Sequence, residues 1–302
     1  MESINAMIML ENASLGYYAI DFVMMVGFMA ALRLFASSIA GVSLTDILAQ
    51  QDNFAVGITL AGAIVAVAIL MMGVVAGDAG SSYIDEISLM AGYGVLALGL
   101  MGVTRKIFDQ IALPSVSIHN EILRGNIAAG IVDAGNLIAT AVIARAAMSW
   151  IDGSSFQGIV ALLGIYLFSQ ILLLVATIYR KKVFEKRHKA SGKMLGSEIA
   201  DGNVALALRF FGHRLGVGLA LTATSGVVIY DASLWMVSLL AWALVAVGMF
   251  LAQTGLSIVL RQILLPGISV GQEVGEQRNI AIGSIEAAIY IGVGFAFVGL
   301  LG

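Results

Sequence analysis

Apolar stretches long enough to cross a bilayer recur along the whole chain, and this feature limits the fold most strongly. A helix needs about 20 mainly apolar residues to span a hydrocarbon core of about 30 Å. Such stretches lie at about 16–40, 54–76, 84–108, 126–148, 156–179, 203–229, 233–260 and 279–301. With 60% hydrophobic and 12% charged residues, the composition does not fit a soluble domain. The sequence therefore predicts an all-α polytopic membrane protein with eight transmembrane helices.

The basic residues indicate how these helices are oriented. Thirteen of the 16 Lys and Arg residues fall at span ends or in loops on one side, most of them in the run RKKVFEKRHKASGK at 180–193. Basic loops stay in the cytoplasm, so we expect 180–202 to be a basic cytoplasmic loop and both termini to be periplasmic. The run is foremost a topological anchor, and contact with an anionic lipid or a protein partner is the alternative. Besides the lipid bilayer no partner is required, and no nucleic acid is expected.

The only two prolines reveal an internal duplication. Pro114 lies in LPSVS and Pro266 in LPGIS, and each motif is followed by a glutamate and then by an Asn-Ile-Ala segment. We therefore divide the chain into two four-helix repeats, 1–150 and 151–302. Because each repeat has an even number of spans, the two should share one orientation, related by a pseudo-twofold axis along the membrane normal.

A finer repeat opens every even-numbered helix. Each of these helices is expected to start at an asparagine and to carry a small residue nine positions later; the asparagines are Asn53, Asn126, Asn203 and Asn279. Asparagine is a favoured N-cap, and small residues let helix backbones approach closely in a membrane. We expect the even-numbered helices to pack centrally, and small faces left over would allow a homo-oligomer. Common descent of the four hairpins and convergence on one capping need are both open readings.

The sequence resembles a known family at these motifs. The loop LP-x-[VI]-S, the glutamate after it and the helix N-[IV]-A…[DE]-A are similar to the YjfL-like domain, a bacterial inner-membrane domain of four spans and unknown function. Two copies would cover nearly the whole chain. The resemblance implies a bacterial inner-membrane location and four helices in each unit, and it implies no catalytic residue.

Ionisable residues inside the spans are the candidate site. Asp133 and Glu286 each follow a cap asparagine by seven residues, which places both about 10 Å deep at 1.5 Å per residue. Arg209, His213 and Arg214 lie at similar or greater depth in the sixth span. An unpaired charge at the centre of a helix costs about 2.5–3.5 kcal/mol on insertion scales. We therefore expect the acids to converge beside the sixth span, shielded from lipid.

A second pair is expected near the opposite side of the membrane, between Asp21 and Arg145. Both residues lie inside apolar stretches, toward the predicted outer face. Pairing would neutralise each of them, as the cost of a lone charge in hydrocarbon requires.

Two functions fit these charges. The first is a channel or transporter for a small ion or polar solute, with proton coupling through the carboxylates and with the arginines as counter-charges or an anion site. The basic residues of the sixth span have no counterpart in the second span. At the positions of Arg209, His213 and Arg214 the first repeat has Thr59, Ala63 and Ile64. The alternative is a non-transporting scaffold that binds partners through 180–193, in an envelope stress response. A wet cavity at the acids favours transport, and dry pairing favours the scaffold.

Enzyme chemistry is not expected. There is no cysteine, and the three histidines show no metal-ligand spacing. The chain carries no phosphate-binding loop and no nucleophile elbow. We therefore expect no catalytic residue, no metal site and no cofactor.

Overall fold

The computed structural model describes residues 12–40, 43–76, 80–151 and 156–302. Within these ranges, eight helices are long and apolar enough to cross a membrane, which confirms the expected fold class. They are α2 (Asn12–Ala40), α3 (Phe54–Val75), α4 (Tyr83–Ile107), α6 (Ile127–Trp150), α7 (Phe156–Arg187), α9 (Val204–Thr222), α11 (Trp235–Leu264) and α13 (Ile280–Leu301).

Short helical segments connect the long helices. They are the π-helical turns η1 (Asp46–Gln50) and η2 (Phe108–Ala112), the α-helices α5 (Ile118–Leu123), α8 (Leu195–Ala200), α10 (Thr224–Val227) and α12 (Val270–Gly275), and the 3₁₀ turns η3 (Lys189–Ser191) and η4 (Ala232–Leu234). The segments after Pro114 and Pro266 thus contain α5 and α12.

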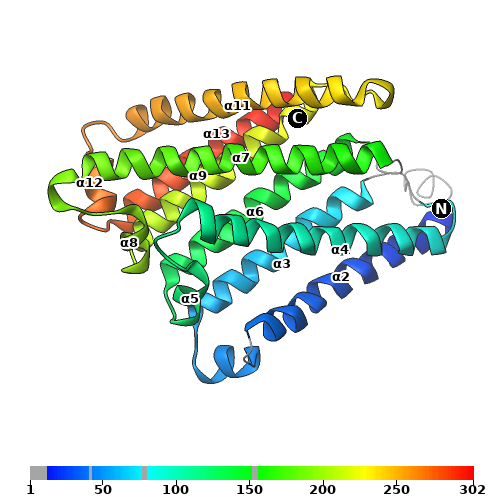
Figure 1. Cartoon of the computed structure of the whole chain (residues 1–302), viewed down its shortest axis with the longest axis horizontal. Coiled ribbons are helices and arrows are strands. Elements are labelled where there is room, and N and C mark those ends of the chain that lie inside the picture. The colour runs from blue at the N-terminus through cyan, green and yellow to red at the C-terminus, as the bar shows by residue number, and fades with distance from the viewer. Residues whose placement is uncertain (1–11, 41–42, 77–79, 152–155) are drawn as a thin grey trace, which may run out of the picture.

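The eight long helices form two layers (Figure 1). In one layer, α3 packs on α6, α6 on α9 and α9 on α13, so these four helices form a row. In the other layer α2, α4, α7 and α11 lie across this row. The row consists of the even-numbered spans, as the small residues after each asparagine predict.

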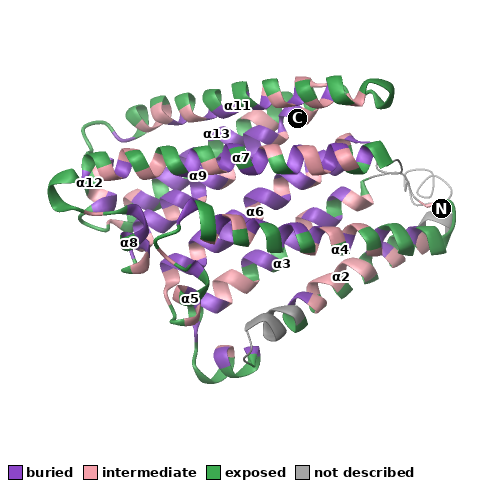
Figure 2. Cartoon of the chain, in the orientation of Figure 1, coloured by how far each residue is buried: buried purple, intermediate pink, exposed green. Residues whose placement is uncertain are grey.

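Burial divides the row into a core and two ends (Figure 2). In α6 and in α9, 78% of the apolar stretch is buried, against 39% in α3 and 33% in α13. The two middle helices have a row neighbour on each side, whereas α3 and α13 have one each. Polar side chains on α6 and α9 are therefore shielded from lipid.

Small residues set how closely the row packs. A Cβ on Gly62 of α3 would overlap the side chain of Ala134 in α6, and a Cβ on Gly212 of α9 would overlap the Cα of Ala287 in α13. A Cβ on Gly135 of α6 would lie 2.7 Å from the ring of Phe211 in α9. The backbones thus approach to a distance that only glycine allows at these positions.

Every helix of the row begins with the same local structure. A short helical segment is followed by a residue in the left-handed region and then by an asparagine; the left-handed residues are Asp52, Gly125, Gly202 and Arg278, with φ of 49°, 86°, 77° and 53°. The side-chain oxygen of each asparagine accepts a hydrogen bond of 3.0–3.3 Å from the N–H three residues later. Asn53, Asn126, Asn203 and Asn279 are thus N-caps. All four local structures are alike, although the chain has two sequence repeats.

The caps also join neighbouring helices. The amide nitrogen of Asn53 donates to the last carbonyls of α5, over 3.2 and 3.1 Å. In the same way Asn126 donates to the end of α8, over 2.9 and 2.8 Å, and Asn203 donates to the end of α12, over 3.1 Å. The four helix starts therefore lie together at one end of the bundle, called here the cap end.

The basic run 180–193 is largely helical, so the expectation of a loop from 180 onwards is wrong. Helix α7 continues to Arg187, and only a 3₁₀ turn separates it from α8. Lys, Arg and Glu are good helix formers, and Phe184 anchors this extension because it is buried. The sequence was misleading because hydropathy falls at the membrane edge while helix propensity stays high.

Glu198 of α8 holds several parts of the cap end together. Its carboxylate accepts a hydrogen bond of 3.1 Å from Asn203, and it pairs with Lys193 over 3.1 Å and with Arg278 over 3.4 Å. Burial alone would raise the pKa of this carboxyl. The hydrogen bonds from Asn203 and Lys193, with the charges of Lys193 and Arg278, outweigh burial and hold the pKa below its ordinary value of 4.5.

The close packing of the row predicts the effect of adding one methyl group. We expect Gly212→Ala to destabilise the protein by about 1–3 kcal/mol, because α9 and α13 must separate to accept the Cβ. Gly248→Ala in α11 is the matched control, since a Cβ there meets no atom within 4 Å. Thermal unfolding in detergent measures both, and an equal midpoint for Gly212→Ala and Gly248→Ala would contradict this account of the row.

The lowered pKa of Glu198 predicts a pH dependence. Because the folded-state pKa lies below the unfolded one, the ionised carboxylate adds stability that is complete above the unfolded-state pKa and is lost as the pH falls through the folded-state pKa. We expect Glu198→Gln to be less stable at neutral pH and to lose less stability on acidification below about pH 4.5. The exposed Glu276→Gln is the control. Melting temperatures measured across pH test this. If those of the wild type, Glu198→Gln and Glu276→Gln decreased in parallel on acidification, the role given to Glu198 would be contradicted.

Candidate functional site

Asp133 forms a buried ion pair with an arginine of its own repeat. Its carboxylate accepts two hydrogen bonds from Arg105 of α4, over 2.9 and 3.3 Å. The side chain of Asp133 is 6% exposed and that of Arg105 is 41% exposed, so the arginine keeps contact with its surroundings outside the bundle. The pair joins α6 to α4 and neutralises the acid.

Glu286 lies at the equivalent position of α13 and is fully buried. Its Oε2 lies 2.7 Å from Nε of Arg209 in α9, and its Oε1 accepts a hydrogen bond of 3.1 Å from Arg261 in α11. The hydroxyl of Tyr290, one helical turn further along α13, donates to Oε1 over 3.4 Å. Glu286 therefore binds two arginines, and both are nearly buried, with side chains 10% and 16% exposed.

Arg180 and His213 surround the ring of Tyr290. The guanidinium of Arg180 lies 4.6 Å from the ring centroid, and the His213 ring meets the Tyr290 ring edge-on at 5.1 Å. Within the described residues, Nε of Arg180 and Nε2 of His213 have no hydrogen-bond partner. Arg180 comes from the basic run, which the helical extension of α7 brings into the bundle.

Arg214 is a buried cation bound only by neutral groups. It donates to the carbonyl of Leu173 over 3.1 Å, to the hydroxyl of Thr177 over 2.9 Å and to the side-chain oxygen of Asn136. Its guanidinium also lies 5.1 Å from the ring centroid of Phe108. Among the described residues, no carboxylate forms an ion pair with Arg214.

The second repeat thus gathers more positive than negative charge. The cation cluster consists of Arg180, Arg209 and Arg261, and the carboxylate among them is Glu286. Arg214 lies apart from this cluster, because its hydrogen bonds go to α7 and to Asn136 of α6. Charge in a low-dielectric interior is costly unless it is compensated. Such a cluster has the electrostatics of an anion-binding site, because guanidinium groups bind oxyanions and halides through several N–H donors.

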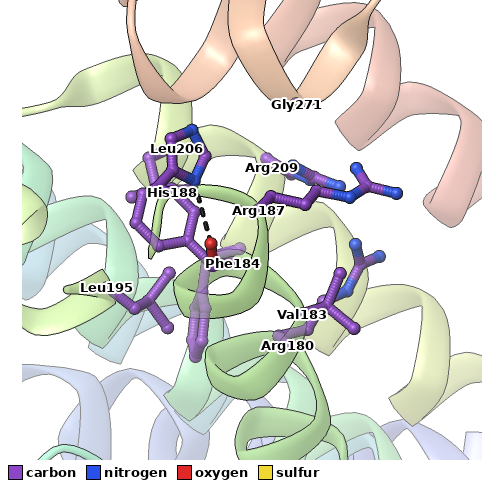
Figure 3. A pocket seen from close by; sticks show the side chains of 10 residues that line it. Arg180, Val183, Phe184, Arg187, His188, Leu195, Leu206, Arg209 and Gly271 are labelled. Carbon is purple, nitrogen blue, oxygen red and sulfur yellow. Dashed lines mark hydrogen bonds between the residues drawn. The ribbon is translucent and has the colours of Figure 1, made fainter. Parts of the chain in front are cut away.

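Two cavities lead from the cap end toward this cluster. The outer cleft has a volume of about 680 Å³ and is lined by Arg187, His188 and Arg261, with residues of α12 opposite. The inner cavity, of about 20 Å³, shares Arg187 and His188 with the cleft and reaches Arg180 and Arg209. Figure 3 shows the guanidinium groups of Arg180, Arg187 and Arg209 on one side of the inner cavity. The inner cavity has room for about one water molecule.

The structure brings together some of the expected site residues and separates others. Glu286, Arg209 and His213 lie around Tyr290, as the expectation of a charged cluster beside α9 requires. The two acids do not converge, because α9 packs between α6 and α13 and Asp133 binds Arg105 on α4. Matched depth places the acids at one level, but their helices lie on opposite sides of α9.

The expected pair of Asp21 and Arg145 is not formed. The carboxyl of Asp21 lies beside that of Glu86 in α4, and no ion pair joins Asp21 to Arg145 among the residues described. Two residues near the same membrane face need not lie on neighbouring helices. Asp21 is on α2, which packs on α3 and α4, whereas Arg145 is on α6.

Sequence reasoning missed the partners of the acids. Arg105, Arg180 and Arg261 were assigned to the membrane edge as topological signals, yet each reaches inward from the last turns of its helix. Long Arg side chains bridge such distances readily. Tyr290 carried a usable signal, because it follows Glu286 by four residues and so shares its helix face.

The described residues contain no group of three or more His, Cys, Asp or Glu side chains that could hold a metal ion. The charged groups of the site are arginines and carboxylates.

A family model matches the chain twice. The model of the Domain of Unknown Function DUF350 covers residues 5–148 and 154–301. No curated protein and no solved structure has significant similarity to the chain. The chain therefore belongs to the DUF350 family, as two tandem domains, and the resemblance to the YjfL-like domain is consistent with this membership.

The different surroundings of the two acids predict unequal effects of neutralising them. We expect Glu286→Gln to destabilise by about 3–5 kcal/mol, because it leaves two nearly buried arginines without their acid. Asp133→Asn should cost less, since Arg105 is 41% exposed and can be solvated. Melting midpoints at neutral pH compare the two variants, and a larger loss for Asp133→Asn would contradict the charge balance described.

Proposed function

We propose that this two-domain member of the DUF350 family is an integral membrane protein that carries a small inorganic anion, with Glu286 as an internal competitor for the anion site. The cation cluster supports this proposal most directly, because it gathers three arginines, Arg180, Arg209 and Arg261, around the single carboxylate of Glu286. Anion binding would supply the negative charge that the cluster lacks.

The cleft at the cap end supports a route to the cluster. Arg187 and Arg261 line the cleft, and Arg180 and Arg209 line or adjoin the narrower cavity behind it. The cleft lining holds Arg187 and Arg261 and one carboxylate, that of Glu276, and an excess of one charge sign in a low-dielectric cleft raises the local concentration of the opposite ion. We place this end in the cytoplasm of an inner membrane and both termini in the periplasm, because basic residues collect at this end.

Glu286 gives the proposal a mechanism. In the described state its carboxylate occupies the arginines that an incoming anion would need. Protonation of Glu286 would remove its charge and free Arg209 and Arg261 for the anion, so that anion entry is coupled to proton uptake. The Tyr290 hydroxyl, 3.4 Å from the carboxylate, supplies a hydrogen bond in either protonation state.

In this proposal Asp133 has a structural role. It is satisfied by two hydrogen bonds from Arg105 and belongs to the other side of α9. The proposal thus assigns transport to the cation cluster of the second repeat and assigns to Asp133 the joining of α4 and α6.

The second candidate function is a scaffold without transport, which binds partners through the basic cap end. Its support is the dry environment of Glu286, whose side chain is 0% exposed and is paired with Arg209. Under this candidate, the arginines and Glu286 fix the relative positions of α9, α11 and α13.

Anion flux into proteoliposomes distinguishes the two candidates. We expect the purified protein to dissipate a chloride gradient when valinomycin lets potassium balance the charge. The chloride flux should be faster at acidic than at neutral pH. Glu286→Gln should conduct at neutral pH and lose the pH dependence, because its arginines are permanently free for chloride. Asp133→Asn is the matched control and should keep the wild-type pH profile.

A second readout separates loss of function from loss of folding. If the cation cluster binds anions, added chloride should restore part of the melting midpoint that Glu286→Gln loses, in proportion to occupancy. Asp133→Asn should gain no more from chloride than the wild type does. Transport would be rejected, and the scaffold would remain, under two results together. The wild type and Glu286→Gln would show no more chloride flux than protein-free liposomes, and chloride would not change their melting temperatures.

A further inference from the structure

The row of central helices is open at both ends, and the two ends carry complementary halves of one repeated interface. Within the chain this interface occurs three times, between α3 and α6, α6 and α9, and α9 and α13. We infer that a second copy of this chain continues the row, with α13 of one copy packed against α3 of the next.

The residue register of the three internal interfaces defines the expected contact. In each, the residue nine positions after one cap asparagine meets the residue eight positions after the next; the pairs are Gly62 with Ala134, Gly135 with Phe211 and Gly212 with Ala287. The same rule applied to the open ends pairs Ala288 of α13 with Ala61 of α3 in the next copy. Both alanines are exposed, so both halves of the fourth contact are free.

The exposed face of α13 has the residues that such an interface requires. Four small residues follow one another at intervals of four on this face, and all four are exposed: Ser284, Ala288, Gly292 and Ala296. A Cβ on Gly292 would meet no atom within 4 Å, although Gly216, at the same position of α9, contacts Tyr290 of the next helix. Small residues at this spacing serve helix–helix contact, and lipid contact alone does not require them.

The cap asparagines give an independent reason to expect a neighbour. Three of them donate to the carbonyls at the end of the next short helical segment, but the amide of Asn279 donates only to Glu273 of its own segment among the residues described. The carbonyls of Ala49 and Gln50, at the end of η1, occupy the equivalent acceptor positions. No asparagine reaches them within the described chain.

The burial of α2 points the same way. In its counterpart α7, 50% of the apolar stretch is buried, partly because α7 packs on α6 of the preceding repeat. In α2 the figure is 6%, and its contacts are with α3 and α4 of its own repeat. In an assembly, α13 of the preceding copy would pack on α2 in the way that α6 packs on α7 within the chain. Because this contact joins different surfaces, it builds a closed ring or an open array.

Disulfide trapping tests the register, and the chain is suited to it because it contains no cysteine. Two differently tagged chains, one with Ala61→Cys and one with Ala288→Cys, are co-expressed and oxidised in the membrane. We expect a linked species that carries both tags and has the mass of two chains. Each variant expressed alone should not link, because position 61 faces position 288 and not itself.

The matched control replaces Ala288→Cys by Gly255→Cys. Gly255 is exposed on α11, its Cβ would meet no atom within 4 Å, and it lies nine residues from the cap end of its helix, at the depth of Ala288. Linking with Ala288→Cys that exceeds linking with Gly255→Cys supports the proposal. Equal or no linking overturns it, whether lipid or another protein covers α13.

A steric variant measures the same contact without cysteine chemistry. Ala288→Trp should lower energy transfer between donor- and acceptor-labelled copies in liposomes, and Gly255→Trp should leave it at the wild-type value. Equal energy transfer in the two variants would also overturn the proposal. Neither experiment depends on anion transport, so the two proposals can fail separately.

Discussion

The capping of four helix starts by asparagine is the constraint on which the rest of this structure depends. A helix that begins at a membrane boundary has backbone N–H groups without partners, and leaving them unsatisfied in hydrocarbon costs several kcal/mol each. Asn53, Asn126, Asn203 and Asn279 satisfy one N–H each through their oxygen. Three of them also bond through their nitrogen to the neighbouring segment, so capping fixes each helix at one height relative to the next. Fixed height then determines which small residues meet.

The consequence is a row in which position after the cap determines surroundings. Seven residues after the cap asparagine, α6 carries Asp133 and α13 carries Glu286. Each acid pairs with an arginine of the preceding long helix in the outer layer, which is α4 for Asp133 and α11 for Glu286. Averaged along their length, the end helices are less buried than the middle ones: 39% of the apolar stretch is buried in α3, against 78% in α9. The same local sequence pattern thus produces a sheltered polar site in one place and a lipid-facing surface in another.

The sequence was sufficient to predict the spans, the caps and the duplication, because each rests on local or strictly periodic signals. The end of α7 was placed too early, since a basic run signals the membrane edge and says little about where a helix ends. The partners of Asp133 and Glu286 were not predicted, because an arginine at the edge of α4 or α11 reaches inward only by virtue of tertiary packing. Depth along a helix is readable from the chain, but the direction a side chain faces depends on which helices become neighbours.

The same reasoning explains why Arg209 and Arg214 of α9 have no basic counterpart in α3 of the first repeat. Arg214 lies eleven residues after its asparagine, in α9, where helices on both sides of the row shelter it. The equivalent residue in α3 is Ile64, which is 36% exposed at the end of the row. An arginine there would face hydrocarbon in a single copy, at a cost of about 2.5–3.5 kcal/mol on insertion scales. The position of α9 in the middle of the row therefore permits buried arginines, which its counterpart α3 could not shelter at the end of the row.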